Sequence, residues 1–83
     1  MLSRQFGGLV RRLRQERGWS QDELADRSGL HRTFVGAVER GEKMATIATA
    51  SKLAHGLGIP LSELFRRFEL SYPEGTGSVP CDS

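Results

Sequence analysis

Apolar residues recur at helical spacing through the first seventy residues and predict an all-α chain. Over residues 3–16 and again over residues 61–68 they follow an i, i+3, i+4, i+7 pattern, which places them on one face of a helix. A third apolar face over residues 47–57 predicts another helix, which Thr46 can cap and Gly58 can end. The members of the three faces are Phe6, Leu9, Val10 and Leu13; Ile47, Ala50, Leu53, Ala54 and Leu57; and Leu61, Leu64, Phe65 and Phe68.

Residues 20–41, between these segments, predict two short helices joined by a tight turn. Ser20 and Glu23 match the Ser-x-x-Glu pattern of a capping box at the start of the first helix. Gly29 follows where a sharp turn needs a residue that tolerates positive φ, and Gly41 ends the second helix. The buried positions predicted for the pair are Leu24, Ala25, Leu30, Val35 and Val38. This arrangement, with polar residues outside the second helix, indicates a helix-turn-helix.

The motifs SQDELA, SGL and HRTFVGAVERG resemble the Cro/C1-type (XRE) family, and the last is similar to the recognition helix of restriction–modification controller proteins. The resemblance implies a five-helix, lambda-repressor-like domain over residues 1–70 that binds DNA and dimerises. It also implies a transcriptional regulator that binds a palindromic operator as a homodimer, with a recognition helix at about residues 31–40 in the major groove. In the family's pattern the arginine at Arg14 pairs with the glutamate that ends this helix, here Glu39.

The exposed face of the recognition helix and the family resemblance together select candidate DNA contacts. Arg32 is best placed for direct readout, because a guanidinium can bind guanine O6 and N7 bidentately, and Thr33 can reach a base or a phosphate. Gln21 matches the family's phosphate-contacting glutamine, while Arg40 and Lys43 just after the helix are candidate phosphate contacts. The full set is Gln21, His31, Arg32, Thr33, Phe34, Gly36, Arg40 and Lys43.

Four positions leave alternatives open. Related controller proteins often carry Asp-Arg-Thr-Tyr where this chain has His-Arg-Thr-Phe. His31 either caps the helix weakly as a neutral imidazole or reaches a phosphate. Phe34 either packs against a sugar or thymine methyl or is buried in the core. Gly7 and Gly8 mark either a close approach of two helices or a frayed first turn.

Basic charge is concentrated in the half of the chain that holds the helix-turn-helix. The 83 residues carry a net charge of +2, but residues 1–40 hold eight Arg against five acidic residues. Such a surface suits the DNA backbone, although a solvated Arg-rich helix face gives the same count. A chain of this length forms one small domain. Residues 71–83, rich in Pro, Gly, Ser and Thr, predict a flexible tail.

Composition argues against several other classes of protein. Hydrophobic residues make up 37% of the chain, without an apolar run that could span a membrane and without a visible secretory signal. Cys81 is the one cysteine, which excludes an internal disulfide and favours a cytoplasmic protein. His31, His55 and Cys81 are too scattered for a metal site, so we expect no metal and no cofactor. No phosphate-binding loop, triad or paired-carboxylate motif indicates an enzyme.

The last predicted helix carries more apolar residues than one inner face needs. They either close the core or form a dimer interface. The candidate interface residues are Ile47, Leu61, Leu64, Phe65 and Phe68. Double-stranded DNA and a second copy of the chain are the expected partners, with RNA polymerase as a further candidate for a regulator. The rival interpretation is an antitoxin-like protein-interaction module that retains the helix-turn-helix fold, but a toxin-binding extension is not evident.

Overall fold

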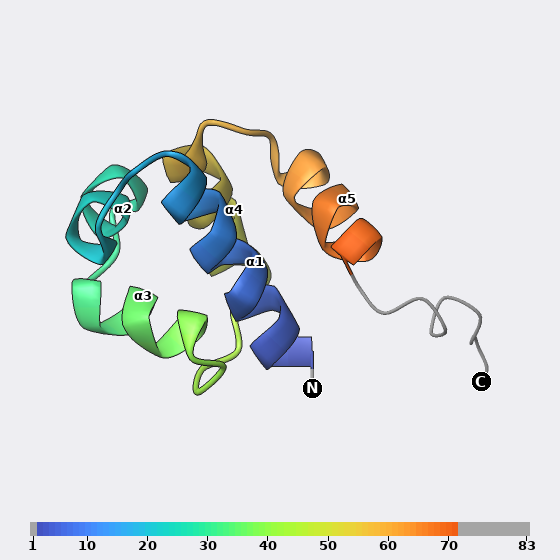
Figure 1. Cartoon of the computed structure of the whole chain (residues 1–83), viewed down its shortest axis with the longest axis horizontal. Coiled ribbons are helices and arrows are strands. Elements are labelled where there is room, and N and C mark those ends of the chain that lie inside the picture. The colour runs from blue at the N-terminus through green and yellow to red at the C-terminus, as the bar shows by residue number, and fades with distance from the viewer. Residues whose placement is uncertain (1, 72–83) are drawn as a thin grey trace.

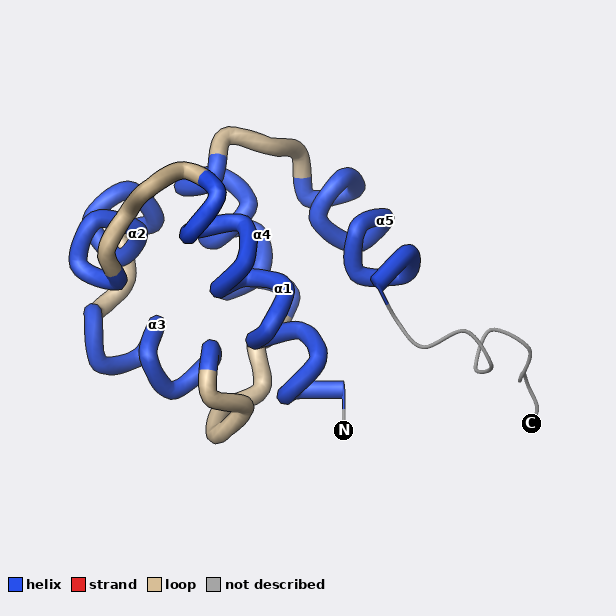
Figure 2. Tube along the Cα trace, in the orientation of Figure 1, coloured by secondary structure: helices blue, strands red, loops and turns tan. Residues whose placement is uncertain are grey.

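The chain is all-α over residues 2–71, the part that the structure, a computed structural model, describes (Figure 1). Its elements are α1 (Leu2–Glu16), α2 (Gln21–Ser28), α3 (Arg32–Glu39), α4 (Ile47–Leu57) and α5 (Leu61–Ser71). Short turns join successive helices, and α1 runs through the middle of the view with α3 and α5 on opposite sides of it (Figure 2). The tail was predicted to begin at Ser71, but Ser71 is the last residue of α5. The rest of the predicted tail, residues 72–83 with Cys81, lies outside the described residues.

Local signals in the sequence set the helix boundaries. The backbone N–H of Glu23 donates to Ser20 Oγ at 3.1 Å, which caps α2, and Thr46 caps α4 in the same way. The Glu23 carboxylate pairs with Arg27, one turn further along α2, at 2.7 Å. Gly29 has φ +69°, so the turn between α2 and α3 uses a left-handed backbone that favours glycine. The predicted Ser20 and Thr46 caps and the glycine turn are therefore confirmed, whereas the Glu23 carboxylate bonds Arg27 in place of the Ser20 N–H that a complete capping box requires.

One hydrophobic core lies among the five helices. It consists of Phe6, Leu9, Val10, Leu13, Leu24, Ala25, Val35, Val38, Ala50, Leu53, Ala54, Leu57 and Leu64. Two sequence predictions are wrong, one about the inner face of α4 and one about the dimer interface. Ile47 is 68% exposed, so the inner face of α4 begins one turn later, at Ala50. Leu64 is completely buried within a single chain, so it cannot join two copies.

A close approach between α1 and α3 centres on Gly7. A Cβ atom at this position would overlap the carbonyl oxygen of Val38 and lie 2.8 Å from the carbonyl oxygen of Glu39. A Cβ at Gly8 would meet nothing within 4 Å. Of the two interpretations of this pair, Gly7 therefore marks a helix–helix contact, and the contact fixes the end of α3 against α1.

The helices of residues 2–71 lack the combination of length and hydrophobicity that a transmembrane segment requires. Within the same residues, histidine, cysteine and acidic side chains do not gather into a group of three or more that could hold a metal ion.

Candidate nucleic-acid interface

Helices α2 and α3 form the helix-turn-helix, joined by the short turn that follows Ser28 (Figure 1). The inner sides of the two helices are closed by Leu24 and Val35, which are completely buried. The side chains in the first turn of α3 face solvent, and Arg32 and Thr33 are both exposed there. An exposed first turn on an otherwise buried helix is the feature that places side chains in a DNA groove.

A buried ion pair anchors the far end of α3 to α1. Arg14 donates from Nε and Nη2 to the two carboxylate oxygens of Glu39, at 2.7 and 2.9 Å. Arg14 Nη1 also donates to the backbone carbonyl of Trp19 at 2.8 Å. The side chains are 11% and 2% exposed, and the bond to Glu39 raises the pKa of Arg14. The pair that the family resemblance implied is present, and its geometry is that of a structural clamp.

Gln21 is held at the start of α2 by the same carboxylate. Its Nε2 donates to Glu39 Oε1 at 3.1 Å. A Cβ at Gly36 would lie 3.3 Å from the Gln21 side-chain oxygen and 3.1 Å from a guanidinium nitrogen of Arg40. Gly36 is therefore buried beneath two of the other candidate contacts, and its prediction as an exposed DNA-facing position is wrong.

The first turn of α3 begins without a side-chain cap. His31 occupies the N-cap position with extended backbone, but its side chain makes no capping hydrogen bond and is exposed. Of the two alternatives for His31, capping is therefore wrong. Arg32 follows with its side chain 63% exposed and Nε 3.1 Å from Asp22 Oδ1 on α2.

A second arginine–carboxylate pair lies just past α3. Arg40 donates from Nε and Nη2 to the two carboxylate oxygens of Glu42, each at 3.0 Å. These bonds raise the pKa of Arg40 and lower the pKa of Glu42, although both groups are exposed. Lys43 is exposed beside them. This segment therefore presents two cations, one of which is already paired.

Phe34 packs against the hydrophobic core while keeping part of its surface exposed. Of its two alternatives, complete burial in the core is therefore wrong, and contact with a sugar or thymine methyl stays a prediction.

The helix-turn-helix family HTH_3 matches residues 10–64 of this chain. The chain belongs to this family. The HTH-type transcriptional regulator SutR of Escherichia coli (strain K12) is 41% identical over 61 residues, which cover 74% of this chain and 34% of SutR. The crystal structure of the restriction-modification controller protein C.AhdI from Aeromonas hydrophila is 44% identical, with a TM-score of 0.72 over 76% of this chain and 96% of C.AhdI. The controller protein C.Esp1396I, crystallised as a tetramer with its natural 35 base-pair operator, is 25% identical, with a TM-score of 0.80 over 86% of this chain and 93% of that one.

The sequence did not predict two acidic residues of the HTH_3 domain that pair with candidate DNA contacts. Asp22 lies ten positions before Arg32, a separation that does not indicate a contact within one helix. The two side chains meet only because the turn between α2 and α3 brings the helices together. Glu42 lies two positions after Arg40, close enough that opposite charges in one turn could have indicated the pair.

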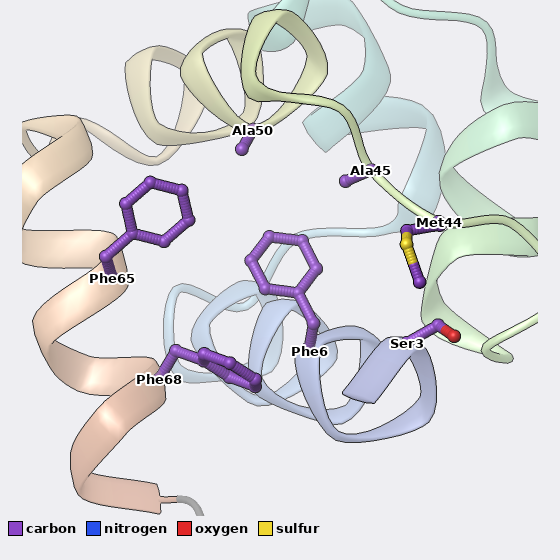
Figure 3. A pocket seen from close by; sticks show the side chains of 7 residues that line it. All are labelled: Ser3, Phe6, Met44, Ala45, Ala50, Phe65 and Phe68. Carbon is purple, nitrogen blue, oxygen red and sulfur yellow. The ribbon is translucent and has the colours of Figure 1, made fainter. Parts of the chain in front are cut away.

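A second surface of this HTH_3 protein is apolar. The residues that line a hollow there come from α1, the segment before α4, α4 itself and α5. Figure 3 shows their side chains around one space: Ser3, Phe6, Met44, Ala45, Ala50, Phe65 and Phe68. Rings of Phe6 and Phe68 meet edge to face, with centroids 5.8 Å apart. Met44 is 68% exposed and Phe65 38% exposed, so the hollow lies within a larger apolar surface.

Proposed function

We propose that this protein is a sequence-specific transcriptional regulator of the controller-protein kind, which binds a palindromic operator as a homodimer. The observation that carries the proposal is the exposed first turn of α3, with Arg32 and Thr33 outward, on a helix anchored by the buried Arg14–Glu39 pair. The operator complex of C.Esp1396I supports DNA as the partner. DNA binding also leads us to expect the protein in the cytoplasm, and RNA polymerase stays a candidate partner.

The candidate contacts divide into base readout and backbone positioning. Arg32 would read a guanine through O6 and N7, and Thr33 would reach a neighbouring base or phosphate. Gln21, at the start of α2, and Arg40 and Lys43, just past the end of α3, would bind phosphates. His31, exposed at the N-terminus of α3, would reach a phosphate, where backbone N–H groups add to the attraction.

The apolar surface supports the second half of the proposal. One recognition helix reads only a few base pairs, so regulators of this class pair across a two-fold axis. Two copies joined through Ile47, Phe65 and the hollow beside them would put their recognition helices about 34 Å apart, matching half-sites one helical turn apart. Leu61 and Phe68 already pack on the core and would contribute their exposed edges.

Selection of bound sites from random DNA tests the function directly. We expect a palindrome with a guanine in each half-site. Recovery of no sequence above background, together with copurification of an unrelated small protein, would instead favour the antitoxin-like module.

Arg32 and Lys43 should differ in how their loss affects binding. Arg32→Ala is expected to weaken binding to the selected operator by about 1–3 kcal/mol and to relax the preference for guanine at one position. Lys43→Ala should weaken binding to every sequence by a similar factor and reduce the slope of log K against log salt by about 1. Fluorescence anisotropy on operator and unrelated duplexes measures both; uniform losses for both variants would make Arg32 a phosphate contact.

The dimer should dissociate when its exposed apolar surface is charged. Ile47→Glu combined with Phe65→Glu should give a folded monomer in sedimentation velocity at tens of micromolar, because both side chains lie outside the core. Leu70→Glu is the matched control: Leu70 is also on α5 and is 72% exposed, yet it does not line the hollow. A double variant that stays dimeric would place the interface elsewhere.

A further inference from the structure

We infer that Asp22 is a positioning residue for base recognition, which acts through Arg32 and sets how strongly the protein discriminates between sequences. The inference rests on the proposed function, in which Arg32 reads a guanine. The helix dipole favours a carboxylate in the first turn of α2 whatever that carboxylate faces. The Asp22 side chain is nevertheless 74% exposed and its Oδ1 lies beside Arg32 on the next helix, so its influence extends beyond α2.

The geometry leaves the reading end of Arg32 available. Asp22 Oδ1 lies 3.1 Å from Nε, the nitrogen nearest the stem of the Arg32 side chain. A guanidinium has five N–H donors, so the two terminal nitrogens can still donate to guanine O6 and N7. Asp22 thereby restrains the Arg32 side chain from the side of α2, and that side chain remains 63% exposed for contact with a base.

An exposed ion pair of this kind adds little to the stability of the free protein. At a DNA surface its effect grows, because water is displaced and the local dielectric falls. The carboxylate then favours one position of the guanidinium over the many that a free arginine samples. It also opposes the use of Arg32 as a simple phosphate contact, since a phosphate close to Arg32 would lie close to Asp22 as well.

The chain contains a matched control for this role. Asp26 lies one turn further along α2, is exposed, and lines the same shallow hollow as Asp22 and Arg32. Among the ion pairs of residues 2–71, however, Arg32 pairs with Asp22 and not with Asp26. Asp22→Asn and Asp26→Asn therefore remove equal charge from the same surface, and only the first removes the partner of Arg32.

The experiment measures, for the full chain, the ratio of affinity for the selected operator to affinity for the same operator with the guanine of each half-site replaced by adenine. Both asparagine variants should bind an unrelated duplex more tightly than wild type, because each removes a negative charge from the DNA-facing side. Asp22→Asn should also lower the operator ratio by about 3- to 10-fold, whereas Asp26→Asn should leave it within about 2-fold. On an Arg32→Ala background, Asp22→Asn should no longer change the ratio.

Three results would overturn the inference, and they are distinguishable. Equal ratios for Asp22→Asn and Asp26→Asn, with a wild-type ratio well above one, would remove the role of Asp22 and leave the proposed function intact. A drop in ratio that persists in the absence of Arg32 would show that Asp22 acts by another route. A wild-type ratio near one would overturn the proposed function and this role with it.

Discussion

Replacing Gly7 with alanine is expected to lower the free energy of unfolding by about 3 kcal/mol or more, which is enough to unfold much of so small a domain. The added Cβ would overlap the carbonyl oxygen of Val38 and lie 2.8 Å from that of Glu39. Both obstacles are backbone atoms, so rotation of a side chain cannot relieve the contact. Either α1 and α3 separate, which exposes the core between them, or the domain does not fold.

Gly8→Ala is the matched control, one position along the same helix. A Cβ there meets nothing within 4 Å, and alanine is favoured over glycine inside a helix by up to about 1 kcal/mol. We therefore expect Gly8→Ala to stabilise the protein slightly, in contrast to Gly7→Ala, in urea unfolding followed by circular dichroism. Equal effects of the two substitutions would mean that α1 does not approach α3 as closely as described.

The features that the sequence predicted correctly depend on local physics. Ser20 and Thr46 cap helices because a side-chain oxygen can reach a backbone N–H three residues on, wherever the helix lies in the fold. Gly29 is identifiable because a left-handed turn excludes most other residues. The helix-turn-helix follows from these signals and from its apolar spacing, so its position was predictable from the chain alone.

Predictions that depend on neighbouring elements were less secure. Periodicity shows that Ile47 and Leu64 lie on apolar stripes, but not which neighbour covers each stripe. The fold buries Leu64 and exposes Ile47. The prediction that Ile47 belongs to the inner face of α4 is therefore wrong. Likewise, the pairing of Asp22 with Arg32 arises from the angle between two helices, and spacing along the chain does not encode that angle.

The buried pair between α1 and α3 leads to the second large effect. Glu39→Gln keeps the size of the side chain but removes the charge that faces Arg14, whose side chain is 11% exposed. Leaving one partner of a buried pair uncompensated costs about 3–5 kcal/mol, so we expect a loss of that size in urea unfolding. The control is Glu16→Gln, which breaks the pair with Arg12 at 3.9 Å, where both side chains are 55% exposed; its cost should stay below about 1 kcal/mol.

A double variant separates the cost of an unpaired charge from the value of the pair itself. Arg14→Met combined with Glu39→Gln removes both charges, so it should recover part of the stability that Glu39→Gln loses alone. Recovery stays incomplete because the Trp19 carbonyl loses its donor. If Glu39→Gln instead left the melting temperature unchanged and abolished operator binding, Glu39 would act at the DNA through Gln21, whose Nε2 it holds at 3.1 Å, and not as an anchor of the recognition helix.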